Sequence, residues 1–297
     1  MIKSYRYECI CIESDFKSLA EKLSMKPTGV FYHPSFSRRS YLTLGNRLRD
    51  FPKAFEVFRD RKNFLLIECP RVDEELILKV HTRDLLEGVK MDPLCSTAWH
   101  SAGGVVKAGE MVIEGKLRNA FCYIGAGGHH AGRNYFWGYC CFNDVVLSIY
   151  NIFEKFGEKR IAIIDTDAHH GDGTRELVRD MKVLHFCICY SNYTSEDGLK
   201  IDRSYFSGDY FEFIDEFCDR ARDYKPDLIF WYFGHDTHIG DYGDIGLTVN
   251  DYVKIAKILK DLAAEVCDEK LIVVLGGGSI PEIARDSTLA IINVLLD

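Results

Sequence analysis

Five short apolar runs, rich in β-branched or aromatic residues, recur along the chain after residue 120. Gly, Pro, Asn or Asp residues bound each of them. Continuous apolar runs of this length are typical of strands that are buried on both faces of a parallel sheet. The runs are Phe121–Ile124, Ile161–Ile164, Val183–Cys189, Leu228–Phe233 and Leu271–Leu275.

Stretches with helical spacing of apolar residues separate these predicted strands. Alternation of strands and helices predicts an α/β fold with a mostly parallel, doubly wound sheet that has helices on both faces. A length of 297 residues fits one large domain or two small ones. Before residue 100 the pattern predicts a strand at Leu65–Ile67 and a helical stretch at Asp73–Val89. The later predicted helices are Asp144–Phe156, Asp209–Tyr224 and Asp251–Val266.

Composition excludes several classes of protein. The net charge of −8 favours solubility and a mild attraction for cationic substrates, and it argues against direct binding of nucleic acid. No apolar run approaches the roughly 20 residues that cross a membrane. The segment Met1–Ile12 lacks the pattern of a secretory signal, so we expect a cytoplasmic protein.

The eleven cysteines are an odd number, and no two of them form a CxxC pair. They lie mostly inside apolar runs, which suits reduced, buried thiols better than a disulfide framework. A zinc cage made of cysteines is not expected. The cysteines in apolar runs are Cys122, Cys140, Cys141, Cys187 and Cys189.

Polar residues and glycines cluster where the predicted strands end. In an open parallel sheet the ligand site lies beyond the carboxyl ends of the strands, so these clusters should meet at one edge. This convergence predicts an active site. The clusters are Gly125–His130, Asp165–Gly173, Gly234–His238 and Gly276–Ser279.

Alternate residues of the second cluster can chelate a metal. Asp165, Asp167 and His169 stand at positions i, i+2 and i+4, so an extended backbone points them the same way. Asp236, at another strand end, is the best candidate for a third ligand. An Asp–His–Asp set leaves a coordination position open for water, as in catalytic zinc sites. Its oxygen-rich character would also suit Fe²⁺, Mn²⁺ or Co²⁺. A single Asp-x-Asp would more often be a helix cap, but the whole run favours a metal.

His129 and His130 are candidate acid–base groups. Their side chains diverge on an extended turn, so each can find its own carboxylate, and Asp165 and Asp172 are available. A carboxylate on one ring nitrogen orients the other nitrogen toward the reacting water. Such a histidine can remove a proton from a metal-bound water and pass one to a leaving amine.

These motifs resemble those of the histone deacetylase family, whose members act on acetyl-lysine, acetylpolyamines or other acylated amines. The resemblance runs from about Val80 to Ser279. It implies a single arginase-like α/β domain, which we extend over residues 1–297. The stretches that carry it are Gly128–Ala131 with Gly138–Asp144, then Ile164–Gly173, and finally Gly234–Asp236 with Leu275–Gly278.

The resemblance implies a role for each matching residue. Asp167, His169 and Asp236 would be the zinc ligands. His129 and His130 would be the catalytic histidines, paired with Asp165 and Asp172. The predicted substrate-binding residues are Gly138, which faces the acyl-lysine stem, Tyr139, which lines the tunnel, Gly277 and Ser279. A structural K⁺ would be held by the backbone around Asp165, Asp167 and His169, together with Cys187 and Ile188.

Two departures from the family pattern matter. Relatives usually carry Tyr at the position of Ser279, where its hydroxyl donates to the developing oxyanion. A serine is several ångströms too short for this, so another donor would be needed. The second departure is that residues Ser35–Asn46 replace an expected Pro-Glu-Arg run. The candidate donors are Tyr190, Tyr193, Tyr242 and His238.

Three functions remain open. The first is a zinc-dependent hydrolase that cleaves the amide of an acylated amine, such as an acyl-lysine, an acylpolyamine or a related small molecule. The second is a protein that keeps the metal and binds acylated ligands or partners with little or no turnover, as Ser279 suggests. The third is a binuclear manganese ureohydrolase, which would need a second ligand motif near Asp236. We expect no nucleic-acid or membrane partner, and the sequence does not specify an oligomeric state.

Overall fold

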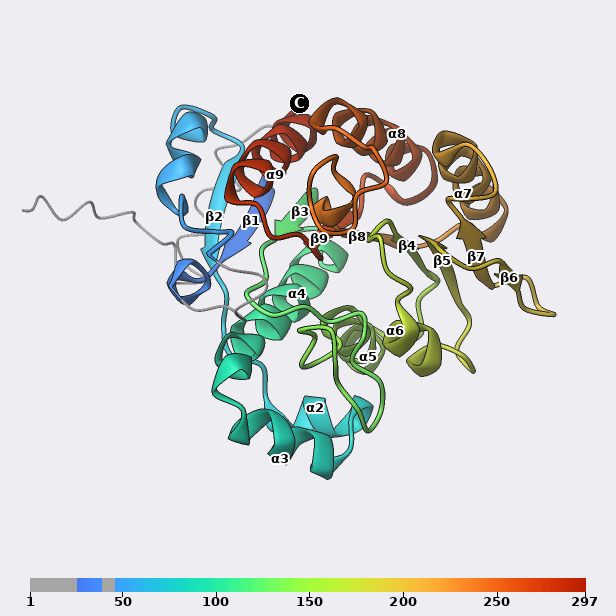
Figure 1. Cartoon of the computed structure of the whole chain (residues 1–297), viewed down its shortest axis with the longest axis horizontal. Helices are drawn as coiled ribbons and strands as arrows, with labels where there is room; N and C mark the ends of the chain where they lie inside the picture. The colour runs from blue at the N-terminus through green and yellow to red at the C-terminus, as the bar shows by residue number, and fades with distance from the viewer. Residues whose placement is uncertain (1–25, 39–45) are drawn as a thin grey trace, which may run out of the picture.

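The computed structural model describes residues 26–38 and 46–297 (Figure 1). Within these ranges nine strands form one sheet in the order β2-β1-β3-β9-β8-β4-β5-β7-β6. All neighbouring strands are parallel except β6 and β7, which are antiparallel. The strands are β1 (Thr28–Tyr32), β2 (Phe64–Glu68), β3 (Asn119–Cys122), β4 (Ile161–Asp165), β5 (Val183–Cys189), β6 (Tyr193–Thr194), β7 (Lys200–Ser204), β8 (Leu228–Phe233) and β9 (Leu271–Leu275).

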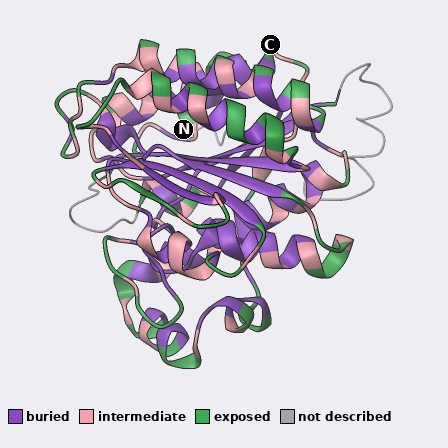
Figure 2. Ribbon diagram, turned by 90° about the vertical axis from the view of Figure 1, so that its right-hand side faces the viewer, coloured by how far each residue is buried: buried purple, intermediate pink, exposed green. Residues whose placement is uncertain are grey.

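Helices cover both faces of the sheet. Figure 2 shows the buried strands between an upper and a lower helical layer. The helices α7, α8 and α9 pack on one face, and α4 packs on the other together with α5. The α-helices are α2 (Glu74–Val80), α3 (Arg83–Met91), α4 (Ala98–Ile113), α5 (Asp144–Phe156), α6 (Asp172–Leu177), α7 (Tyr210–Tyr224), α8 (Val249–Cys267) and α9 (Pro281–Leu296), and the 3-10 helices are η1 (Pro34–Ser37), η2 (Lys53–Phe58), η3 (Pro93–Thr97) and η4 (His235–Thr237).

Side-chain caps fix the starts of the main helices. Asn143 accepts the amide hydrogen of Val146 at the start of α5, and Asp209 does the same for Phe211 at the start of α7. Thr248 begins a capping box in front of α8. Such caps satisfy amide groups that have no partner inside the helix, and each stabilises its helix by about 1 kcal/mol.

The predicted α/β fold with a mostly parallel sheet in a single domain is confirmed. The strands β5, β8 and β9 have the predicted bounds, whereas β3 ends two residues earlier than predicted, at Cys122. The strands β1, β6 and β7 and the helices α4 and α9 were not predicted. Residues 1–25 of the predicted domain and most of the Ser35–Asn46 segment lie outside the described residues.

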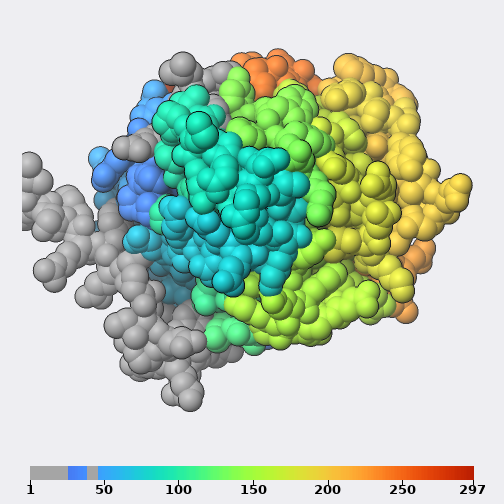
Figure 3. All heavy atoms as spheres, turned by 90° about the horizontal axis from the view of Figure 1, so that it is seen from below, coloured from blue at the N-terminus to red at the C-terminus, as the bar shows by residue number. Residues whose placement is uncertain are grey.

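The stretch Asp73–Val89 is largely helical, as predicted, but it forms two helices, α2 and α3, with a break between them. His81 has an extended backbone between them, and Thr82 caps α3 by accepting the amide hydrogen of Leu85. The imidazole of His81 also contacts Gly132 O at 2.7 Å, which ties the break to a distant loop. On the lower side of the molecule α2 and α3 (cyan) form the centre of the surface (Figure 3).

One pair of cysteines departs from the expectation of reduced thiols. Cys95 in η3 and Cys141 in the loop before α5 form a disulfide. The other seven cysteines in the described residues are buried. No helix in the same residues is long and apolar enough to span a membrane.

Register across the sheet places the polar ends of four strands in one row. Asp165 of β4 pairs with Tyr232 of β8 on one side and with Cys187 of β5 on the other. Cys187 in turn pairs with Asp202 of β7. Paired residues of neighbouring strands project to the same face. The sheet therefore brings these four side chains to one face, close to its carboxyl edge.

Candidate active site

Asp167, His169 and Asp236 meet at the carboxyl edge of β4 and β8. One potential ligand atom from each lies within 4.8 Å of the others. The Nδ1 atom of His169 is 3.1 Å from Asp167 Oδ1 and 3.0 Å from Asp236 Oδ2. The two carboxylates are buried, whereas the imidazole side chain is 40% exposed. The group is thus open on the imidazole side.

The electrostatics of this group suit a cation. Burial and the neighbouring Asp167 raise the pKa of Asp236 to about 7. Burial raises the pKa of Asp167 too, but His129 and His169 outweigh that effect and lower it. Two buried carboxylates side by side are costly unless positive charge compensates them. Two carboxylates and an imidazole are also suitable ligands for a divalent zinc-like ion.

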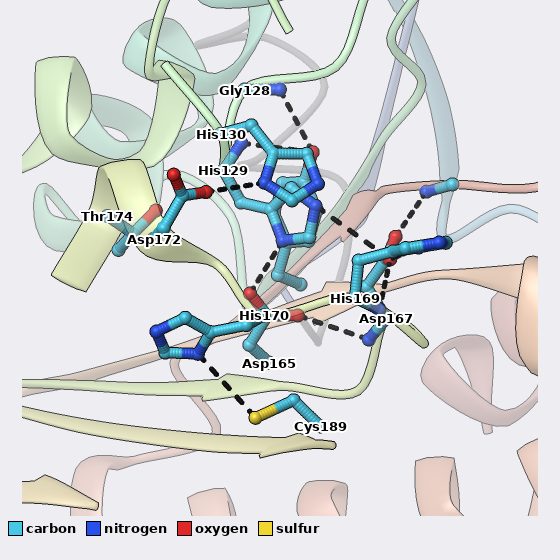
Figure 4. A network of polar contacts seen from close by, with 12 residues as sticks. Gly128, His129, His130, Asp165, Asp167, His169, His170, Asp172, Thr174 and Cys189 are labelled. Carbon is cyan, nitrogen blue, oxygen red and sulfur yellow. Dashed lines mark hydrogen bonds and ion pairs between the residues drawn. The ribbon is translucent and has the colours of Figure 1, made fainter. Parts of the chain in front are cut away.

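His129 lies beside this group and has its own carboxylate. Its Nδ1 is 2.9 Å from Asp165 Oδ2, and its Nε2 is 3.8 Å from Asp167 Oδ1 (Figure 4). The ring stacks on Tyr232 with centroids 4.7 Å apart. The Tyr232 hydroxyl also accepts the amide hydrogen of Gly128 at 3.0 Å, which fixes the loop after β3.

His130 has a second, separate carboxylate. Its Nδ1 is 2.6 Å from Asp172 Oδ1 at the start of α6. The other carboxylate oxygen accepts the indole N–H of Trp137 at 3.0 Å. The rings of His130 and Trp137 lie 4.0 Å apart, and Trp137 is 50% exposed. The predicted pairing of each histidine with its own aspartate is thus present as a contact.

The two histidines have opposite pKa shifts. Burial lowers the pKa of His129, but the charges of Asp165 and Asp167 outweigh it and raise that pKa to about 9. Burial and the neighbouring His129 lower the pKa of His130 to about 4, despite its contact with Asp172. Titratable neighbours whose pKa values are driven apart are characteristic of acid–base sites.

Gly138 packs its backbone directly against His130. Its φ is +56°, and a Cβ atom there would lie 2.5 Å from Cδ2 of the imidazole. Only glycine meets both conditions without strain. Tyr139 follows with φ of +64°, is partly buried, and accepts the amide hydrogen of Gly127 through its carbonyl. These residues therefore form the wall beside the histidines.

Gly277 brings the loop after β9 onto the two carboxylates. Its amide donates to Asp167 Oδ2 at 2.6 Å. A Cβ atom on Gly277 would lie 2.7 Å from both Asp167 Oδ2 and Asp236 Oδ2, and 2.8 Å from the hydroxyl oxygen of Tyr242. The phenol oxygen therefore shares one small space with the two carboxylates. Burial, followed by the charges of Asp236 and Asp167, raises the pKa of Tyr242 and keeps the phenol protonated.

Ser279 is held by Asp241 rather than by the open side of the site. Its hydroxyl donates to Asp241 Oδ1 at 2.8 Å, and its amide contacts both oxygens of the same carboxylate. Asp241 also accepts from Ile280 N and contacts Nδ1 of His235 at 3.1 Å. This carboxylate therefore fixes the end of the glycine loop and the start of α9.

The other three candidate donors lie elsewhere. Tyr190 and Tyr193 follow β5, are 54% and 51% exposed, and approach His170 and Arg175 respectively. The ring of His238 contacts the carbonyl of Ile239. Of the four hydroxyl or imidazole groups considered, only that of Tyr242 is beside the carboxylates.

Sequence analysis missed two residues of this site. Arg47 is buried beneath the glycine loop and donates to the carbonyl oxygens of Gly276 (2.5 Å), Gly278 (3.2 Å) and Ile124 (3.3 Å). It precedes β2, in a region without readable periodicity, so no sequence signal marked it. Asp241 was visible beside His238, but its partners are set by the tertiary fold.

A further group of potential metal ligands lies on the side of Asp165 that faces away from His129 and His130. The sequence analysis did not predict this group. It contains His170, Cys187, Cys189 and Asp202, and none of these belongs to the run around Asp236. The second ligand motif that a binuclear ureohydrolase needs near Asp236 is not found among the described residues. The K⁺ site around Asp165 and Cys187 stays a prediction.

Aspartates, histidines and glycine loops thus gather at the carboxyl edge of a parallel α/β sheet, which is the place where such sheets carry their ligand sites. The family model for the histone deacetylase domain matches residues 91–196 and 199–295. The chain therefore belongs to the histone deacetylase family.

Two similar proteins are named as deacetylases. A probable deacetylase of Archaeoglobus fulgidus is 29% identical over 83% of this chain and 76% of its own length. Histone deacetylase 5 of Arabidopsis thaliana is 31% identical over 67% of this chain, but the match spans only 34% of that protein. The crystal structure of the HDA15 HD domain superposes with a TM-score of 0.80 over 92% of this chain and 90% of that one, at 22% identity. That likeness concerns the fold.

Proposed function

We propose that this chain is a zinc-dependent hydrolase that cleaves the amide of an acylated amine. The observation that carries the proposal is the meeting of Asp167, His169 and Asp236 next to two histidines that have separate aspartate partners. A divalent ion held by these three residues would polarise the acyl carbonyl and acidify a water. Such a site suits acyl-lysine, acylpolyamine or a related small molecule.

The two histidines would carry the protons. Asp165 and Asp172 hold Nδ1 of His129 and of His130, which leaves each Nε2 directed away from its carboxylate. A base in this position removes a proton from water, and an acid returns one to the leaving amine. The aspartates fix the ring orientation and stabilise the protonated form.

The mouth of the site would hold the apolar stem of the substrate. Trp137 is half exposed, its ring lies against that of His130 in a tilted arrangement, and it is next to Gly138 in the chain. An alkyl chain can lie against such aromatic and glycine walls, because burial of each CH₂ group contributes about 0.8 kcal/mol. The net charge of −8 favours a cationic ligand over an anionic one.

Tyr242 would replace the missing oxyanion donor. Its hydroxyl accepts the amide hydrogen of Gly278 and is beside the carboxylates, so its own proton is free to point into the site. Ser279 cannot serve while it donates to Asp241. If Tyr242 does not donate, the second function applies: a metal-binding protein that holds acylated ligands with little turnover.

Metal analysis tests the first part of the proposal. We expect one divalent ion to leave the purified protein when Asp236 is changed to Asn, because a carboxylate ligand is lost. The exposed Asp261→Asn change on α8 is the matched control and should keep the metal. Unchanged metal content in Asp236→Asn would contradict the assigned ligands.

A substrate panel tests the second part. Zinc-loaded protein should hydrolyse at least one member of a set of acyl-lysine peptides and acylpolyamines, and Asp236→Asn should not. Calorimetry with the same compounds would separate the two functions. Binding without hydrolysis in fully metal-loaded protein would support the ligand-binding alternative.

A further inference from the structure

Four potential ligands converge on the side of Asp165 that faces away from the two catalytic histidines. His170 follows His169, Cys187 and Cys189 belong to β5, and Asp202 belongs to β7. One nitrogen, sulfur or oxygen atom from each lies within 4.8 Å of all the others. In Figure 4 the ring of His170 points away from His129 and His130, toward Cys189.

The sheet itself builds this cluster. Cys187 and Cys189 are two residues apart on β5, so both project to the same face. Cys187 is in register with Asp202 of the neighbouring strand β7, which brings that carboxylate to the same face. The loop after β4 then places His170 beside Cys187, Cys189 and Asp202.

The distances suit tetrahedral coordination after small adjustments. Cys189 Sγ is 3.5 Å from His170 Nδ1, and the same nitrogen is 3.7 Å from Asp202 Oδ1. In a tetrahedral zinc site with the usual bond lengths, ligand atoms lie roughly 3.3–3.8 Å apart. A pair of cysteines, a histidine and an aspartate is also a soft ligand set that favours zinc over magnesium or calcium.

The charges around the cluster balance when a divalent ion is present. Two thiolates and the carboxylate of Asp202 carry three negative charges, and Arg175, which pairs with Asp202, carries one positive charge. A divalent ion supplies the other two. Cys187, Cys189 and Asp202 are buried, so an unbalanced set of these charges would be costly. The side chain of His170 remains 19% exposed and lines a cavity of about 740 Å³, which offers an entry path.

We propose that His170, Cys187, Cys189 and Asp202 form a second metal site, which binds a thiophilic divalent ion such as Zn²⁺. On binding, both thiols lose their protons to solvent and two metal–sulfur bonds form. The bound ion ties the loop that carries His169 and Asp172 to β5 and β7. The proposal does not depend on catalysis at the first site.

Cobalt substitution distinguishes the two sites, because only the second has sulfur ligands. In Asp236→Asn protein stripped of metal, added Co²⁺ should bind near one equivalent and give thiolate-to-cobalt charge-transfer absorption. The Cys187→Ser and Cys189→Ser variants should each weaken that absorption, and the double variant should lose it. Cys218→Ser on α7 changes a buried cysteine that belongs to neither group of ligands, so this variant is the matched control and should retain the absorption.

X-ray absorption on the zinc-loaded, unmutated protein provides a test that does not depend on folding of the variants. We expect zinc–sulfur scattering at about 2.3 Å, a distance that the Asp–His–Asp site cannot produce. Zinc spectra with only oxygen and nitrogen neighbours would overturn the proposal. A cobalt spectrum without a thiolate band in Asp236→Asn, or a band that survives in the double Cys variant, would also overturn it. Binding of K⁺ alone beside Asp165 would also overturn the proposal.

Discussion

The hydroxyl oxygen of Tyr242 accepts the amide hydrogen of Gly278 across 2.9 Å. This bond fixes the oxygen beside Asp167 and Asp236 and leaves the phenolic proton for a ligand. Tyr242 thus approaches the site from the loop after η4, whereas the usual tyrosine of the family would approach from the position of Ser279.

Tyr242→Phe should abolish most of the hydrolytic activity without loss of metal. Removal of one oxyanion donor typically lowers kcat by about 10²–10³-fold, whereas KM should change little because ground-state contacts remain. Steady-state kinetics on zinc-loaded protein measure both. Tyr190→Phe removes a hydroxyl remote from the carboxylates and serves as the control. If Tyr242→Phe retained kcat within twofold, Tyr242 would not be the donor.

Ser279→Ala should cost stability more than activity. The hydroxyl donates to Asp241, and hydrogen bonds to a charged group contribute roughly 1.5–3 kcal/mol. The loss should fall at the lower end, because Asp241 keeps the amide hydrogens of Ser279 and Ile280. Urea unfolding measures the change in the free energy of unfolding. A much larger loss of kcat than of stability would mean that Ser279 itself contacts the reacting group.

Asp172→Asn should reduce kcat/KM by roughly 10–100-fold, the usual range for the partner of a functional histidine. The amide keeps a contact with His130 but removes the charge that favours a protonated ring. Trp137→Phe is the matched comparison, because it removes only the indole hydrogen bond to Asp172 and keeps an aromatic ring. We expect a smaller effect from Trp137→Phe. Equal losses from the two changes would indicate that positioning of Asp172, rather than its charge, matters.

His81 should make the protein less stable in mild acid. Burial lowers its pKa to about 4 from 6.5, although the bond to Gly132 O opposes the shift. The amide of Asn143 donates to its Nε2 at 3.0 Å, and protonation of that nitrogen would break this bond. Below pH 6.5 the His81 ring binds a proton in the unfolded chain but stays neutral in the native protein. The free energy of unfolding therefore decreases as pH falls toward 4.

The expected contribution of His81 is a loss of about 2 kcal/mol between pH 7 and pH 5. Urea unfolding of the wild type and of His81→Asn at both pH values isolates it, because other titrating groups are common to both proteins. The variant should be less stable at pH 7 and should show a shallower pH dependence. Parallel pH dependences would assign the acid sensitivity to other groups.

The strands that bear the site could be predicted because β4, β5, β8 and β9 are continuous apolar runs with polar ends. Helix α4 could not, because Gly103, Gly104 and Gly109 disfavour a helix locally. Tertiary packing requires them: a Cβ atom on Gly103 would lie 2.0 Å from the carbonyl oxygen of Pro70. Close approach to a neighbouring segment leaves no signal in local periodicity.

The candidate site could likewise be predicted only in part. Asp167, His169 and Asp236 were predicted together because strand ends of a parallel sheet share one edge. The choice of Tyr242 among four donors could not be made, since it depends on how the loop after η4 folds back onto Gly278. The cluster of His170, Cys187, Cys189 and Asp202 depends on the register between β5 and β7, and β7 was itself not predicted.

Arg47 joins a segment before β2 to the edge of the sheet that carries the candidate site. The family match begins at residue 91, yet this guanidinium crosses beneath the glycine loop and binds the carbonyl oxygens of Gly276 and Gly278. Strand β1 lies between β2 and β3 and is the second strand from one edge of the sheet. A fragment that starts at residue 91 would lack the Arg47 donor for those carbonyl groups. It would also lack β1, so β3 would become an edge strand. Swapping segments between relatives must therefore keep Arg47 together with the glycine loop, and β1 together with β3.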